Sequence, residues 1–212
     1  MKKIFLILFF GSIPMLSQEN NGLLFFGEYV QAATFLEDNG GTAYGGTLNL
    51  QKNTNLFTGR YMYHDVNDVE TSGINLAQQP SVRTDTQWNL HEIALLYGKR
   101  YVKRGHSYSF SAGVSYNSLD IEIVNTISAT ATNQFSETRV SENDNYIGVP
   151  LEVNIKWFKK KKSPYRVLEL FPVGEDTAVG NSIGVKLFGT ISKSSVIGVG
   201  LTIGIGSHKY YE

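Results

Sequence analysis

Two of the four histidines flank one acidic segment, and they are the residues best suited to proton transfer. His64 stands directly before the segment DVNDVE (65–70), and His91 follows it further along the chain. A histidine beside a serine or a carboxylate can serve as a general base, provided that the groups meet in a defined geometry. His64 and His91 are therefore the catalytic candidates, but the interpretation that we favour is a solvated histidine beside an acidic loop.

Six charged residues share the polar side of segments in which apolar and polar side chains alternate. They are Glu28, Arg60, Glu92, Glu152, Lys156 and Lys186. Glu28 is included although its segment alternates poorly. Glu152 and Lys156 are four residues apart on one strand, about 13 Å along it, so each needs partners on neighbouring strands. Two interpretations are compatible with these charges, an ion-paired plug and a water-filled polar channel. We favour the plug because a small barrel has little interior room.

Other chemistry is not indicated by the sequence. The chain has no cysteine, which excludes disulfides, a thiolate metal site and a cysteine nucleophile. The segment DVNDVE lacks the glycine and the distal glutamate of an EF-hand, and the basic run KKKK (159–162) predicts a solvated turn that can touch anionic headgroups. Lys plus Arg and Asp plus Glu both number 19, so nothing favours nucleic-acid binding. We expect no cofactor, no metal and no nucleic-acid partner.

The elements that must position these residues are β-strands. In VIGVGLTIGIG (196–206) bulky apolar residues alternate with small ones, which is the period of a strand. Seven further segments alternate similarly, and about 9–11 residues suffice for a tilted strand to cross a membrane. The eight segments are 23–33, 42–52, 55–64, 89–99, 106–117, 145–158, 182–192 and 196–207. The sequence therefore predicts an all-β, closed antiparallel transmembrane β-barrel of eight strands.

The connections are of two kinds. Tight turns are predicted at KNTN (52–55) and RYVKRG (100–105), and long loops at 65–88 and 118–144. Long loops at one rim and short turns at the other are typical of outer-membrane barrels. The long segment 159–181 falls on the short-turn side; its residues 165–173 are predicted to be a short helix or part of an extra hairpin, which would give ten strands.

The residue types decide which face meets lipid. Ile197, Val199, Leu201, Ile203 and Ile205 are predicted to face lipid, and the small residues between them a crowded lumen. Aromatic residues support two girdles at the membrane interfaces. One girdle is predicted from Tyr61, Tyr63, Trp88, Tyr116 and Tyr146, the other from Phe57, Tyr101, Tyr108, Trp157, Phe158, Tyr210 and Tyr211.

The N-terminus predicts export. Lys2 and Lys3 precede the short apolar run 4–10, which is too short to span a bilayer as a helix but suits a secretory signal peptide. We predict a signal peptide at 1–18 and a single barrel domain at 19–212. The predicted location is the outer membrane of a Gram-negative bacterium.

The barrel segments resemble a family. EIALLYGKRY (92–101), YIGVPLEV (146–153) and the glycine-alternating final strand are similar to small outer-membrane β-barrel proteins common in Bacteroidota, with the OmpA-type transmembrane barrel as the better-known relative. Members of this family mostly lack an assigned activity. The ending KYYE departs from the terminal aromatic residue typical of such barrels. The resemblance implies contact with outer-membrane lipid and lipopolysaccharide, and with the barrel assembly machinery during biogenesis.

Three functions are compatible with these observations. We favour a non-enzymatic barrel with a structural, interaction or adhesion role, whose long loops contact an unidentified external ligand. Some related outer-membrane barrels modify lipid A with a rim histidine, which would employ His64 or His91. The third possibility is a soluble, lipocalin-like barrel that binds apolar ligands.

Overall fold

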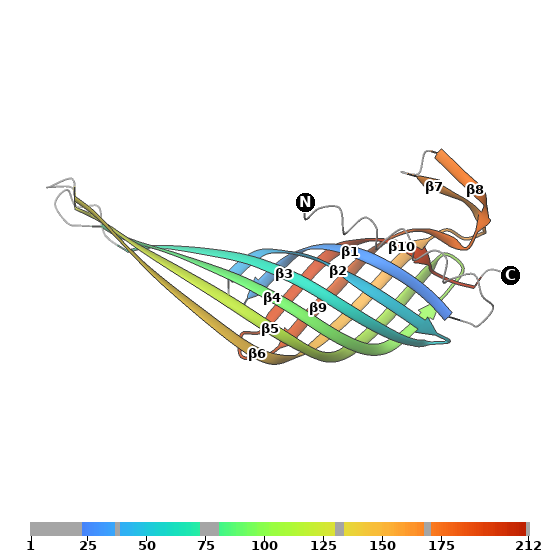
Figure 1. Cartoon of the computed structure of the whole chain (residues 1–212), viewed down its shortest axis with the longest axis horizontal. Helices are drawn as coiled ribbons and strands as arrows, with labels where there is room; N and C mark the ends of the chain where they lie inside the picture. The colour runs from blue at the N-terminus through green and yellow to red at the C-terminus, as the bar shows by residue number, and fades with distance from the viewer. Residues whose placement is uncertain (1–22, 37–38, 73–80, 130–133, 168–170, 211–212) are drawn as a thin grey trace, which may run out of the picture.

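Eight strands form a closed barrel in the computed structural model, which describes residues 23–36, 39–72, 81–129, 134–167 and 171–210 (Figure 1). The barrel strands are β1 (Leu23–Leu36), β2 (Asn39–Lys52), β3 (Asn55–Ser72), β4 (Ser81–Val102), β5 (His106–Ala129), β6 (Gln134–Phe158), β9 (Val179–Ile191) and β10 (Val196–Ser207). Every neighbouring pair is antiparallel, and β1 pairs with β10 to close the ring. The predicted all-β, closed antiparallel barrel of eight strands is confirmed. The described residues contain no helix long and apolar enough to span a membrane.

Short turns define one end of the barrel, which we call the turn end. Lys52 pairs with Asn55, so that Asn53 and Thr54 alone connect β2 to β3. Asn53 has a φ of 56°, a left-handed conformation that asparagine adopts more readily than most residues. The turn between β4 and β5 and the start of β1 lie at this same end, because the strands alternate in direction.

The segment after β6 forms a hairpin outside the barrel. β7 (Ser163–Val167) and β8 (Phe171–Thr177) pair only with each other, as a separate two-stranded sheet (Figure 1). The Lys159 ammonium donates to the carbonyl oxygens of Ser163 and Thr177, at 3.0 and 2.7 Å, and so ties the hairpin base together. The predicted extra hairpin is therefore present, but the ten-stranded barrel and the short helix are wrong.

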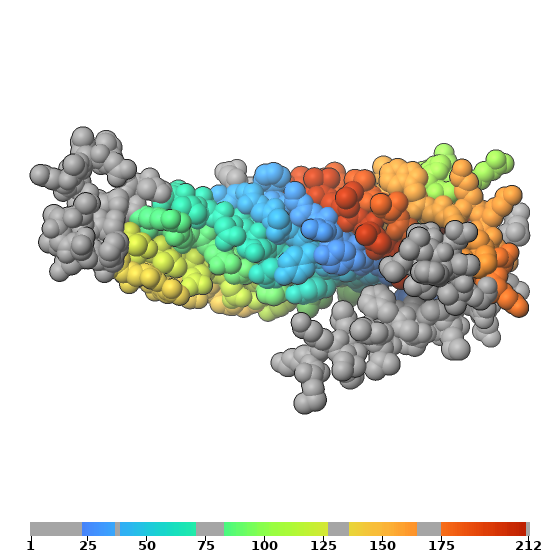
Figure 2. All heavy atoms as spheres, turned by 90° about the horizontal axis from the view of Figure 1, so that it is seen from above, coloured from blue at the N-terminus to red at the C-terminus, as the bar shows by residue number. Residues whose placement is uncertain are grey.

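The two predicted long loops are largely strands, and the prediction of loops there is wrong. β3, β4, β5 and β6 continue past the other barrel rim as a four-stranded sheet, which extends to the left in Figure 1. Its cyan to yellow atoms lie at the same end in Figure 2. We call this sheet the protrusion; it comprises 66–72, 81–88, 119–129 and 134–144. Its many Val, Ile and Thr residues favour strands. Interspersed charges interrupt the apolar alternation on which the sequence analysis relied.

The outer face of the barrel carries a continuous apolar belt. Leu95, Ile147 and Leu201 are 68%, 66% and 61% exposed, and the other outward residues of β5, β6, β9 and β10 are chiefly aliphatic or aromatic. The residues of β10 predicted to face lipid all point outward; Ile197, Val199, Leu201 and Ile203 are exposed and Ile205 is half-buried. Trp88, Tyr146 and Phe158 are exceptions to the predicted girdles, because each lies on the inward face.

The small residues of β10 line the lumen, where close packing requires them. A Cβ atom at Gly200 would lie 2.5 Å from the Ala32 Cβ and from the Gln31 carbonyl oxygen. A Cβ at Gly198 would lie 2.4 Å from the Phe188 ring. Any larger residue at these positions would therefore force β1 and β10 apart or displace the lumen side chains.

Single cysteines at adjacent β10 positions test the two faces. The chain has no native cysteine, so Leu201→Cys and Thr202→Cys each introduce one thiol. Leu201 is 61% exposed outside, whereas Thr202 is 2% exposed in the lumen. In intact membranes we expect a small lipophilic thiol reagent to modify Leu201→Cys and spare Thr202→Cys, as measured by the mass of the purified protein. Modification of Thr202→Cys alone would reverse the assigned faces.

Candidate functional site

Six buried charged side chains meet in the middle of the lumen, and each of five strands contributes at least one of them. Each comes from an inward position of its strand, and all are at most 5% exposed. They are the residues that the sequence analysis assigned to the lumen: Glu28 of β1, Arg60 of β3, Glu92 of β4, Glu152 and Lys156 of β6, and Lys186 of β9. The barrel thus brings together groups that are up to 158 residues apart in number, as Glu28 and Lys186 are.

These groups form a chain of alternating charge. Arg60 bridges two carboxylates, with its Nη2 2.6 Å from Glu92 Oε1 and its Nη1 3.2 Å from Glu152 Oε2. Lys186 continues the chain, 2.9 Å from Glu152 Oε1 and 3.5 Å from Glu28 Oε2. Lys156 pairs with Glu28 at the far end. Three carboxylates balance three cations, so the buried cluster has no net charge if all six groups are ionised.

Neutral side chains complete the coordination of the carboxylates. Thr190 donates to Glu92 at 3.0 Å, and Asn49 and Asn154 donate to Glu28 at 3.2 and 3.4 Å. Buried charges are tolerated when partners and hydrogen bonds together compensate for lost hydration. The cluster is therefore a polar plug across the lumen, built from groups that hold each other in place.

Apolar side chains fill the lumen from this plug to the base of the protrusion, whose first residues they include. One cluster contains Val30, Ala32, Ala43, Met62 and Phe188. A second contains Leu36, Val66, Leu90, Leu119 and Val196, with Trp88, Ile121 and Tyr146 packed against it. The alternation did not predict these two apolar clusters inside the barrel. Because β1 supplies several of them, its inward and outward residues do not differ in polarity, which explains its poor alternation.

The two candidate histidines point to opposite faces and cannot share a site. They are neighbours in register, since His64 pairs with Leu90 and Tyr63 with His91. His64 is fully buried in the lumen; its Nδ1 lies 3.1 Å from Thr34 Oγ1 and its Nε2 3.9 Å from Glu92 Oε2. This arrangement contains a hydroxyl, an imidazole and a carboxylate, but all three side chains are inaccessible to a substrate.

His91 lies on the outside of the barrel among aromatic rings. Its Nδ1 is 2.9 Å from the Tyr61 hydroxyl, and its ring centroid is 4.8 Å from that of Tyr63. Exposed hydroxyl and imidazole groups on an otherwise apolar surface suit the interface between headgroups and hydrocarbon. In the described part of the chain, no three His, Asp or Glu side chains are grouped to hold a metal ion.

Arg100 and His208 close the turn end of the lumen, and neither was predicted from the sequence. Arg100 donates from Nη1 to Gln51 Oε1 at 2.6 Å and to the His208 carbonyl oxygen at 3.0 Å. Its guanidinium lies 4.6 Å from the Phe26 ring centroid, and His208 stacks on Phe158 at 5.5 Å. Arg100 shares the inward parity of Glu92, a signal that was lost because the predicted strand ended at residue 99. No period-2 signal identifies His208, which follows β10.

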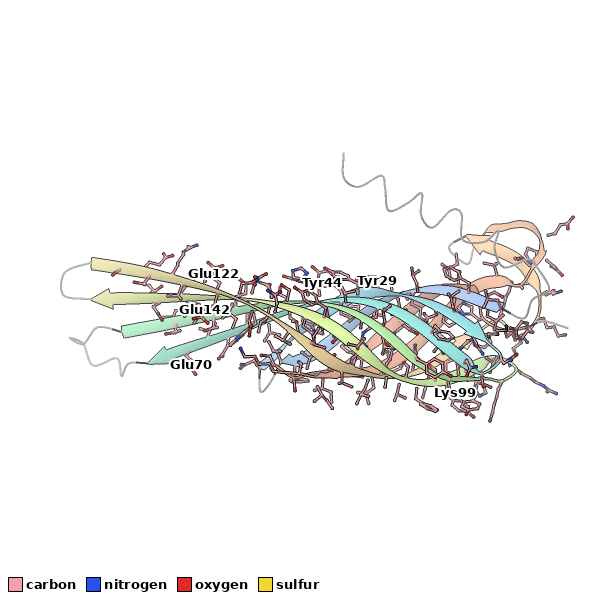
Figure 3. The ribbon with its side chains drawn as sticks, turned by 60° about the horizontal axis from the view of Figure 1, so that its bottom comes forward. Tyr29, Tyr44, Glu70, Lys99, Glu122 and Glu142 are labelled. Atoms are coloured by element: carbon pink, nitrogen blue, oxygen red, sulfur yellow. The ribbon has the colours of Figure 1, made fainter. Side chains whose placement is uncertain are left out.

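Charge is segregated between the two ends of the molecule. Residues 65–88 and 118–144, which contain the protrusion, carry nine acidic residues and two arginines, a net charge of −7. Glu70, Glu122 and Glu142 lie on the protrusion and Lys99 lies at the opposite end (Figure 3). Beside the rim, the Lys193 ammonium donates to Asp144 at 2.5 Å, which raises the pKa of Lys193.

The chain is similar to small barrels among solved structures. No family model matches it, and no curated protein matches it. The attachment invasion locus protein Ail of Yersinia pestis has a TM-score of 0.42 at 9% identity, over 87% of this chain and 96% of that one. Its complex with the heparin analogue sucrose octasulfate gives 0.41 and 8% over the same shares, 87% and 96%. Neisserial surface protein A gives 0.38 and 10%, over 89% of this chain and 97% of that one.

Removing one carboxylate from the plug tests its contribution to stability. Glu152→Gln leaves Arg60 and Lys186 without their shared partner, at a cost expected to be about 3–5 kcal/mol. Asp144→Asn is the matched control, since it breaks an ion pair whose side chains are 38% and 69% exposed. We expect it to cost at most about 1 kcal/mol. Denaturant unfolding of the refolded protein in detergent measures both, and equal costs would contradict a stabilising plug.

Proposed function

We propose that this chain is a non-enzymatic outer-membrane β-barrel of a Gram-negative bacterium that holds an acidic interaction surface outside the cell. The observation that carries this proposal is the continuation of four strands past the apolar belt as the protrusion. β5 and β6 have 24 and 25 residues, whereas about 9–11 are enough to cross a membrane. The remaining length raises a polar sheet well above the bilayer.

The location rests on the apolar belt and on the closed sheet. Exposed Ile, Leu and Val around a complete ring suit lipid tails, and closure leaves no unpaired strand edge within the hydrocarbon. We accordingly propose outer-membrane lipid and lipopolysaccharide as surroundings and the barrel assembly machinery as a partner in biogenesis. The predicted signal peptide lies outside the described residues. We also propose that the chain is related to the small outer-membrane barrels of Bacteroidota, of the OmpA type.

The two alternative functions find less support. A lipid A-modifying enzyme would need an accessible base, whereas His64 is buried with Thr34 and Glu92 and His91 points out among tyrosines. A lipocalin-like carrier would need an apolar cavity inside and a polar surface outside. Here the charge plug and two apolar clusters fill the described lumen, and the exposed surface is apolar.

The charge of the protrusion favours a cationic partner. The protrusion has a free edge on β3 after Val66 and another on β6 before Val149, within the residues that the structure describes. Asp68 and Glu70 on one edge and Glu137 and Glu142 on the other disfavour pairing with a further strand. We therefore propose recognition through carboxylate side chains, which attract positive charge over about 8 Å at physiological salt.

Thiol labelling of intact cells tests the orientation. Glu142→Cys places a thiol on the protrusion, and Lys161→Cys places one near the turn end; both native residues are exposed. We expect a membrane-impermeant maleimide to label Glu142→Cys in intact cells, and Lys161→Cys only after the outer membrane is permeabilised. Labelling of Lys161→Cys in intact cells with Glu142→Cys protected would invert the topology. Recovery of the unmodified protein in a detergent-free soluble fraction would exclude the membrane location.

Neutralising the protrusion tests the proposed surface. The variant Asp68→Asn, Glu70→Gln, Glu122→Gln, Glu137→Gln and Glu142→Gln removes five of its charges without shortening a strand. We expect binding of the purified protein to polylysine-coated beads to fall about tenfold or more at low salt, since surface charges set such attraction. Glu175→Gln with Asp176→Asn on β8 is the control and should bind as the unmodified protein does. Unchanged binding by the five-residue variant would contradict recognition through these carboxylates.

A further inference from the structure

We propose that a pocket at the turn end of the barrel binds a phosphate group. The pocket has a volume of about 470 Å³ and lies between the β2–β3 turn, the β4–β5 turn and the chain after β10. Its lining contains four basic residues and no acidic one, namely Arg100, Lys103, Arg104 and Lys209, together with the tyrosines Tyr101 and Tyr210. A concave pocket in which a few polar and charged groups converge is typical of small-ligand sites.

Arg100 is the residue that points most directly to an anion. It is 1% exposed, and the hydrogen-bond partners that the described residues give it are all neutral: Gln51 Oε1, Ser107 Oγ and the His208 carbonyl oxygen. Its Nη2 makes no hydrogen bond within the described part of the chain. Arg60, the other buried arginine, contacts two carboxylates. A buried guanidinium without a counter-charge is costly, and a bound anion with paired oxygens would relieve that cost.

The surroundings of Arg100 add positive charge from two further elements. Lys103 and Arg104 stand exposed on the β4–β5 turn. Lys209 donates to the carbonyl oxygens of Arg104 and Lys160, at 3.2 and 2.6 Å, which joins the chain after β10 to this turn. Arginine binds phosphate oxygens through two parallel hydrogen bonds, whereas lysine contributes a point charge. The pocket thus combines a buried arginine with a cationic rim from two further elements.

Two sources can supply this phosphate. One is the headgroup of an anionic phospholipid, which rests on the proposed membrane location because it needs the turn end to lie at a lipid interface. The other is a soluble phosphate, whose binding does not depend on the membrane location. Tyr101 is 40% exposed beside the pocket, as suits a ring at headgroup depth.

The test uses the refolded full barrel in a neutral detergent. Isothermal titration calorimetry with inorganic phosphate measures the soluble source. Native mass spectrometry of protein released from phosphatidylglycerol and phosphatidylcholine nanodiscs measures the lipid source. We expect Arg100→Gln and Arg104→Gln each to weaken binding about tenfold in whichever arm binds, which corresponds to one charge-assisted hydrogen bond. Arg83→Gln, on the protrusion, is the matched control and should bind as the unmodified protein does.

The outcomes separate the site from its source. Binding of inorganic phosphate that depends on Arg100 supports the pocket even if the protein proves not to reside in a membrane. Retention of phosphatidylglycerol alone supports a headgroup site. If Arg100→Gln fails to fold, the exposed Arg104→Gln and the charge-retaining Arg100→Lys still decide, and Arg100→Lys should keep part of the affinity. Absence of binding in both arms, or binding that all three substitutions leave unchanged, would overturn the proposal.

Discussion

The pairing of β1 with β10 is the interaction on which the rest of the molecule depends. It joins the two ends of the described sheet through eleven residue pairs, from Phe26 with Gly206 to Leu36 with Val196. Because the ring is closed, the barrel has no strand edge to protect, and its outer face can consist of apolar side chains. The small residue Gly200 permits this closure, since a Cβ there would lie 2.5 Å from the Ala32 Cβ and the Gln31 carbonyl oxygen of β1.

Closure also dictates the contents of the lumen. An eight-stranded barrel has an interior just wide enough for side chains to fill. Every inward side chain must therefore find a partner from another strand. In the middle of the lumen the partners are opposite charges, in the order Glu92, Arg60, Glu152 and Lys186. Nearer the protrusion they are aliphatic and aromatic groups. At the turn end the described partners of Arg100 are all neutral, which distinguishes that end chemically from the middle of the lumen.

The protrusion is stabilised differently from the barrel. Its strands have lost their neighbours β2 and β9, so that two edges are open, and beyond its base the described side chains are exposed or half-buried. The sheet is stabilised there by hydrogen bonds between the strands and by its β-branched side chains. Charged residues at its edges disfavour pairing with a further strand. Negative charge is concentrated on the protrusion and positive charge at the turn end, although the 19 acidic and 19 basic residues of the chain balance overall.

The sequence by itself determined the barrel, because period-2 alternation identifies a strand and its faces without knowledge of any neighbour. For this reason Leu201 and Lys186 could be assigned to opposite faces. Alternation says nothing about where a strand ends once both faces meet water, so the sequence predicts loops where the structure has the strands of the protrusion. Only the tertiary structure decided which charges meet, since partners such as Arg60 and Glu152 are 92 residues apart and are joined by strand register. It alone revealed the pocket around Arg100, because that site depends on the close approach of turns and of the chain after β10.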